Sequence, residues 1–83
     1  MRVVEGKHVE WVEQEAVVLD PESGLLHYLN PTAALVYALI LEHGFDDAMQ
    51  ELERSYADNP DMKEELPALL EEMVEQGLLE AER

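Results

Sequence analysis

The sequence predicts an α+β domain of the winged-helix-like type, in which a three-stranded antiparallel sheet precedes three helices. Three observations predict this order. Short β-branched or alternating segments fill the first third of the chain, and leucine-rich stretches with helical spacing fill the rest. Asn-Pro pairs at residues 30–31 and 59–60 mark helix boundaries. The 83 residues suffice for a single domain, 1–83, with a core expected over about residues 9–79.

The first third of the chain supplies three candidate strands. Residues 9–11 alternate apolar and polar side chains, as a half-buried strand does, and residues 16–19 form a β-branched run. The D-P-E-S-G sequence at residues 20–24 is a strong turn signal, because proline fixes φ early and glycine supplies a positive φ late. Residues 25–29 then read as a third strand, and the short connections make the three an antiparallel meander.

Two helices are expected to follow the sheet. Asn30 is a good N-cap, proline at the next position suits the first helical turn, and the helix should run from Thr32 to about His43. Gly44 should end it. The second helix should start near Asp46 as its N-cap. Its apolar stripe at helical spacing consists of Phe45, Met49, Leu52 and Tyr56.

A third helix is predicted between the second Asn-Pro pair and Gly77. Leucine and methionine recur there at i, i+3, i+4 and i+7, namely Leu66, Leu69, Leu70 and Met73. Pro67 inside this stretch removes a backbone bond, so a shorter helix that begins at the proline is an alternative. Residues 78–79 should pack back onto the core. Since three short strands cannot bury both faces alone, the helices should pack on one side of the sheet.

The chain is strongly acidic, with 20 acidic against 5 basic side chains and a net charge of −15. Such a chain repels the phosphate backbone and anionic membrane surfaces, so we expect no nucleic-acid and no membrane partner. Residues 1–44 carry 7 acidic and 2 basic side chains, whereas residues 45–83 carry 13 and 3. The second half therefore favours a basic or neutral partner surface.

The sequence contains no cysteine, which excludes disulfides, thiolate metal sites and cysteine nucleophiles. Its longest apolar run, residues 33–41, is far shorter than a membrane span of about 18 residues. The N-terminal residues lack the basic-then-apolar pattern of a signal peptide. We therefore expect a cytoplasmic protein.

No residue pattern indicates catalysis. His8, His27 and His43 are isolated, without a second ligand at metal-like spacing, so no metal and no cofactor are expected. The adjacent carboxylates fall on predicted helix surfaces, whereas acid–base catalysis needs a dry pocket. There is no nucleophile-elbow sequence and no phosphate-binding glycine loop. The chain is therefore expected not to be an enzyme and to have no catalytic residues.

A binding function has better support. The third strand of a meander can lie at the edge of the sheet, where its unpaired backbone groups can accept an extended peptide as a fourth strand. Residues 25–29 are unusually apolar for an edge. Alternation requires one set, either Leu25, His27 and Leu29 or Leu26 and Tyr28, to face away from the helices, and the sequence leaves this choice open.

Several segments together resemble the PqqD-like family, also called RiPP recognition elements, where RiPP denotes a ribosomally made and post-translationally modified peptide. Residues 17–24 read V-V-L-D-P-E-S-G, residues 28–34 read Y-L-N-P-T-A-A, and residues 73–79 read M-V-E-Q-G-L-L. The family shows a leucine before a D-P-x-[ST]-G turn, an aromatic strand ending in L-N-x-T, and a closing G-L-[LIV]. The resemblance covers roughly residues 9–79, and the family fold of three strands and three helices matches the prediction above.

The resemblance implies that the chain binds the leader of a precursor peptide as an added strand beside the third strand, in a cleft walled by the third helix. It implies delivery of that peptide to a leader peptidase or another modifying enzyme. By position, the implied peptide-binding residues are Leu25, Leu26, His27, Tyr28, Leu29, Leu66, Leu69, Leu70 and Met73. Glu65 is the nearest match to an Asp that the family often has early in the third helix.

The sequence departs from the family at two places. Pro67 follows Glu65, and residues 25–26 are leucines where the family commonly has an aromatic pair, so the pocket is expected to prefer different leader side chains. The L-N-P-T-A-A-L sequence at residues 29–35 is similar to the lasso peptide branch, and the short chain suggests a free-standing element.

Three alternatives stay open. An apolar edge strand that binds no leader could pair with itself, which would make the chain a self-associating module, a homodimer, unrelated to peptide modification. A DNA-binding winged helix would need a basic recognition helix, but the third helix carries Lys63 among many glutamates. An enzyme lacks any supporting motif.

Overall fold

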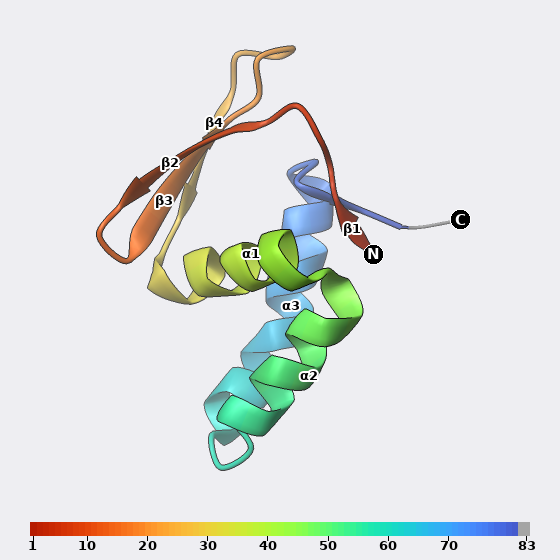
Figure 1. The fold of residues 1–83 in the computed structure, drawn as a ribbon. Helices are drawn as coiled ribbons and strands as arrows, with labels where there is room; N and C mark the ends of the chain where they lie inside the picture. Colours follow the sequence, from red (N-terminus) through yellow and green to blue (C-terminus); the bar gives the residue numbers. More distant parts are fainter. Residues whose placement is uncertain (82–83) are drawn as a thin grey trace.

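The computed structural model describes residues 1–81 and contains five strands and three helices within them (Figure 1). The strands are β1 (Arg2–Val3), β2 (His8–Val12), β3 (Glu15–Leu19), β4 (Leu26–Leu29) and β5 (Leu79–Glu80). The helices are α1 (Pro31–His43), α2 (Phe45–Ser55) and α3 (Pro60–Glu75). This architecture confirms the predicted α+β fold.

The main sheet has the order β2-β3-β4 and is antiparallel throughout. Its hairpin between β2 and β3 turns over only Glu13 and Gln14, because Val12 pairs with Glu15. The turn before β4 is closed by a bond of 2.7 Å from the Gly24 amide to the Asp20 carbonyl. The predicted meander is therefore confirmed, with strand bounds that differ by at most one residue.

A second sheet of two short strands was not predicted. β1 pairs antiparallel with β5, so that Arg2 lies opposite Glu80, and these two side chains form an ion pair of 2.7 Å. The Val4 amide also donates to the Leu78 carbonyl at 3.0 Å. These contacts join the N-terminal segment to the segment after α3, and Leu78 and Leu79 are buried as expected.

Gly44 is the single residue between α1 and α2. Its φ of 82° is not helical, so α1 ends before it and α2 begins after it. α1 starts as predicted, since the Asn30 side chain accepts a bond of 2.9 Å from the Ala33 amide. The prediction of Asp46 as N-cap of α2 is wrong. With a single residue between the helices, Phe45 is already helical and Asp46 lies in the first turn.

α3 is longer than in the alternative prediction, in which the helix begins at Pro67. It begins at Pro60 behind Asn59, whose side chain accepts a bond of 3.2 Å from the Met62 amide. Pro67 lies inside the continuous helix at an exposed position, and Met62, in the turns before it, is still buried. The helix closes with bonds from the Gly77 and Leu78 amides to the last-turn carbonyls, as in a Schellman motif.

One face of the main sheet packs against α1, and α2 in turn packs against α1. All three helices lie on the same side of that sheet (Figure 1). The core is a single cluster to which β3, β4, each helix and the segment after α3 contribute. Within residues 1–81, no helix combines the length and apolar character needed to cross a membrane.

Candidate functional site

β4 is an edge strand, because it pairs with β3 and with no other strand among residues 1–81. The Asp20 amide donates to the Leu25 carbonyl at 2.9 Å, which makes that pair hydrogen bonded. Hydrogen-bonded and non-bonded pairs alternate along an antiparallel ladder. The backbone N–H and C=O groups of Leu26 and Tyr28 therefore point away from β3, toward the free edge.

The structure decides which face of β4 belongs to the core. Leu29 is buried and His27 is partly buried, so these two face the helices. Leu26 and Tyr28 point outward and are 67% and 61% exposed. The edge therefore offers outward backbone groups beside large apolar side chains that lie on the open face of the sheet.

A small cleft of about 100 Å³ lies between the end of β4 and α3. Residues from the strand and from the start of α1 form one side, and the second half of α3 forms the other. The lining consists of Tyr28, Leu29, Asn30, Ala33, Leu69, Glu72, Met73 and Gln76. The free edge of the sheet thus lies next to a helical wall, as a groove for an extended chain requires.

The structure brings together part of the predicted site. Tyr28, Leu29, Leu69 and Met73 all line the cleft, but Met73 is only 1% exposed and belongs to its floor. The other predicted residues lie outside the lining. Leu25 and Leu26 are exposed along the edge, His27 faces inward, Leu66 and Leu70 pack against the core, and Glu65 lines a different groove.

Four lining residues were not predicted: Asn30, Ala33, Glu72 and Gln76. Glu72 and Gln76 follow Leu69 at i+3 and i+7, so an extension of the apolar stripe to its polar neighbours identifies them. Glu72 supplies the only charge of the lining. The cleft should therefore favour a neutral or basic residue in whatever it binds.

The turn before β4 is held by Asp20. Its carboxylate accepts bonds from the Ser23 hydroxyl at 2.9 Å and from the Glu22 amide at 3.1 Å, and Lys7 lies 3.3 Å away. The bond from Ser23 is the main cause that lowers the pKa of Asp20. These contacts fix the start of β4 and so the position of its edge.

The outer face of the sheet carries one polar contact beside the edge. The Tyr28 hydroxyl donates to the Glu15 carboxylate on the neighbouring strand, and this bond raises the pKa of Tyr28. Among residues 1–81, no group of three or more His, Asp and Glu side chains is placed to hold a metal ion. The site is a strand edge that combines outward backbone donors and acceptors with exposed apolar side chains.

The family model of coenzyme PQQ synthesis protein D (PqqD) matches residues 15–79 of the chain. The chain belongs to the PqqD family. The matched segment contains β3, β4 and all three helices, and therefore both walls of the cleft. No curated protein matches the sequence significantly.

Among solved structures, the fold of this PqqD family member is similar to that of TbiB1 in complex with the TbiA(beta) leader peptide. The TM-score is 0.80 at 19% sequence identity, over 100% of this chain and 99% of the other. At this identity the similarity shows the fold. The shared fold extends over the full length of this chain.

Proposed function

We propose that the protein binds the leader region of a ribosomally made precursor peptide and presents it to a modifying enzyme or leader peptidase. The leader adds as a fourth strand to the free edge of β4, with α3 beside it. The observation that supports this proposal best is the outward backbone of Leu26 and Tyr28 next to the cleft between β4 and α3. Membership of the PqqD family and a fold shared with a leader-peptide complex support it.

Strand addition divides the recognition into two parts. Backbone bonds to Leu26 and Tyr28 give affinity for any extended segment. Alternate leader side chains then point toward Leu69 and the rest of the lining, and their fit gives the preference for one sequence. Because the cleft is small, it suits single apolar side chains better than a bulky cluster.

Within this class we propose the lasso peptide type and a cytoplasmic element without catalytic activity. The L-N-P-T-A-A-L sequence supports the type, since it builds the junction between β4 and α1 at the end of the cleft. The absence of cysteine from the sequence fits a reducing compartment.

The test is fluorescence anisotropy with a labelled leader peptide from the precursor gene beside the gene for this protein. Tyr28→Pro removes the outward amide of β4 and should weaken binding at least about tenfold, since an edge proline leaves the sheet intact. The control is Trp11→Pro, which removes an outward amide from the opposite edge, on β2, and should leave leader affinity unchanged. Equal affinity of the Tyr28→Pro variant and the unaltered protein would contradict addition at β4.

Self-association is the second candidate. The side chains of Val12, Leu26 and Tyr28 are exposed. A strand edge that binds no leader can also pair with a second copy of the chain. Light scattering over a range of protein concentrations separates the two candidates. A tight homodimer that binds no leader supports self-association, and a monomer that binds leader supports the adaptor.

A further inference from the structure

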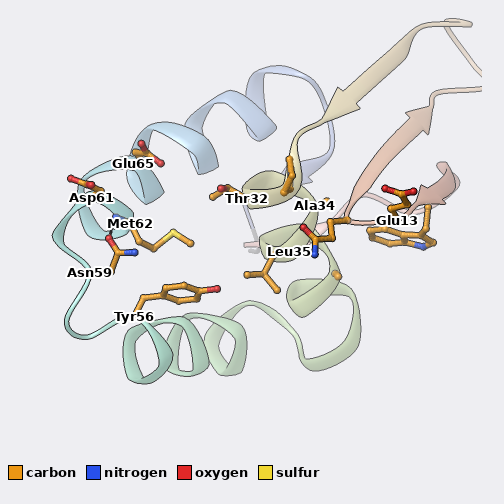
Figure 2. Close-up of a pocket in the computed structure, with 13 residues that line it drawn as sticks. Glu13, Thr32, Ala34, Leu35, Tyr56, Asn59, Asp61, Met62 and Glu65 are labelled. Atoms are coloured by element: carbon orange, nitrogen blue, oxygen red, sulfur yellow. Dashed lines mark hydrogen bonds between the residues drawn. The ribbon is translucent and has the colours of Figure 1, made fainter.

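A groove of about 640 Å³, much larger than the cleft, lies on another part of the molecule (Figure 2). It runs between the β2–β3 hairpin and the corner where α2 meets α3, and α1 forms its floor. Its α1 residues Pro31, Ala34, Leu35 and Ala38 share one helix face at i, i+3, i+4 and i+7. Ala33, which lines the cleft, lies on the opposite face, so the two sites are separated by α1.

The groove contains apolar side chains that remain partly exposed to solvent. Leu35 is 37% exposed on the floor, and Trp11, the only tryptophan of the sequence, is 48% exposed at the hairpin. Tyr56, which is partly exposed, and Met62, which is buried, line the other end of the groove. Its volume lies within the range of about 300–1,000 Å³ that is usual for ligand pockets. Partly exposed aromatic side chains of this kind are enriched where proteins meet.

The groove is also negatively charged. Its lining contains Glu13, Asp61 and Glu65 but no lysine or arginine, and within residues 1–81 none of these carboxylates forms an ion pair. The starts of α1 and α3 reach the groove with a partial positive charge of about 0.5 each. Their caps Asn30 and Asn59 already accept bonds from the first turns. Three full negative charges outweigh them, so the groove favours cations.

Figure 2 shows how these groups are arranged. Asp61 and Glu65 lie at one end with Tyr56 and Asn59, Glu13 lies at the other end, and Leu35 and Thr32 lie between them. Asp61 and Glu65 are four residues apart on α3, where like charges repel each other unless a cation lies between them. An occupant that matches this order has basic side chains at both ends of an apolar stretch.

We propose that the groove docks a segment of a partner protein in which apolar side chains are flanked by lysine or arginine. The arginine or lysine at one end contacts Asp61 and Glu65, and the one at the other end contacts Glu13 beside Trp11, where the indole favours a cation. A second copy of this chain matches the acidic groove less well than a basic segment does, because each copy carries a net charge of −15. This interface is independent of the β4 edge, so both can be occupied at once.

The test titrates ¹⁵N- and methyl-labelled protein with acetyl-Arg-Leu-Leu-Leu-Arg-amide as the probe and follows chemical shifts. We expect saturable shifts of the Trp11 indole N–H and of the Leu35 and Met62 methyl groups, with no shift at the Tyr28 amide. The control peptide, with glutamate in place of both arginines, should leave the spectrum unchanged. Equal shifts with both peptides, or no shifts with either, would overturn the proposal.

A matched pair of variants then tests the role of the groove carboxylates. Glu13→Gln/Glu65→Gln should weaken binding of the probe by about five-fold or more, as expected for the loss of two exposed charge contacts. Glu64→Gln/Glu71→Gln removes the same charge from exposed α3 positions outside both sites and should preserve affinity. An equal loss of probe affinity in the two variants would show that the probe responds only to the net negative charge of the protein. That result would overturn the proposal.

Two further results would also overturn it. If the groove signals shift with protein concentration alone, the occupant is a second copy. If the leader peptide itself moves them, the groove belongs to the leader site. Because the leader assay reads the β4 edge and this titration reads the groove, failure of one leaves the other interpretable.

Discussion

Leu69 links the edge of β4 to the helical wall, because it is the apolar α3 residue of the cleft lining that is not fully buried. A leader strand beside β4 would bury the remaining surface of Leu69. The burial of one leucine contributes about 1.5–3 kcal/mol when it is complete, and a fraction of this when it is partial. Affinity should therefore respond strongly to a change at this position.

We predict that Leu69→Asp weakens leader binding by about tenfold or more, because a carboxylate at the cleft loses apolar contact and must be desolvated. Anisotropy with the labelled leader measures the change. Val74→Asp is the matched control, since Val74 is on the same helix, exposed and outside the cleft lining. If the two variants bind equally well, α3 is not the wall of the leader site.

Asp20 gives a prediction for pH. Its pKa in the folded protein is lowered below the ordinary value of 3.8, mainly by the Ser23 hydroxyl bond. Its contribution to stability is therefore present above pH 3.8 and is lost as the pH falls through the lower folded pKa. We expect Asp20→Asn to lower the free energy of unfolding near pH 7 and to have no such effect well below pH 3.8.

Urea denaturation of the unaltered protein and the Asp20→Asn variant at several pH values measures this difference. Glu22→Gln serves as the control, since its exposed side chain makes none of the turn contacts in residues 1–81. A difference between the unaltered protein and Asp20→Asn that stays constant down to pH 2 would show that the bond from Ser23 does not depend on the charge of Asp20.

At the scale of elements, α3 contains an interior proline without a break. Pro67 has no amide to donate to the Lys63 carbonyl, and an interior proline costs about 3 kcal/mol relative to alanine. The helix tolerates this cost because Pro67 is exposed, while Met62 before it and Met73 after it are buried. Tertiary contacts on both sides of the proline hold the helix together.

We predict that Pro67→Ala stabilises the protein by about 1–3 kcal/mol, with unchanged leader affinity because Pro67 lines neither site. Thermal and urea denaturation measure the stability, and anisotropy measures the binding. Ala68→Pro at the next exposed position is the opposite change and should destabilise α3. A Pro67→Ala variant of lower stability would indicate that a bend at the proline is needed for packing.

An element could be predicted where the residues that determine it are close together in the sequence. Asn30 and Asn59 cap the helices that follow them, and this needs only a few neighbouring residues. The pairing of β1 with β5 joins residues at opposite ends of the chain, and two-residue strands carry no alternation to detect. The predicted start of α2 was wrong because Gly44 is both the C-cap of α1 and the N-cap of α2.

Only part of the candidate site could be predicted, again because the sequence shows local patterns but not contacts between distant segments. The edge strand and the α3 stripe are visible in the sequence, but both faces of residues 25–29 are apolar, so burial alone decides which face is the core. Glu65 was placed in the cleft by its position in the family pattern. In the structure it precedes Leu69 by one helical turn and lines the groove at the start of α3 instead.

At the scale of the whole molecule, the net charge of −15 opposes folding, because self-repulsion is greatest in the compact state. Salt screens such repulsion. We predict that 0.5 M sodium chloride raises Tm, and a gain of about 1 kcal/mol corresponds to about 4–8 °C for a domain of this size.

Circular dichroism melts at increasing salt measure this effect. A Glu64→Lys/Glu71→Lys variant replaces two exposed negative charges by positive ones and should respond less to salt. A Tm that falls or stays constant with salt would show that the ion pairs of Lys7 and Arg54 outweigh the general repulsion.

The pairing of β1 with β5 places the two ends of the described chain side by side, as Figure 1 also shows. Neither strand contributes to the cleft or to the groove. A protein tethered to either end would therefore emerge at the same corner of the domain and leave both surfaces free. The same proximity suits circular permutation, in which a short linker joins the two ends and the chain is opened at an exposed loop.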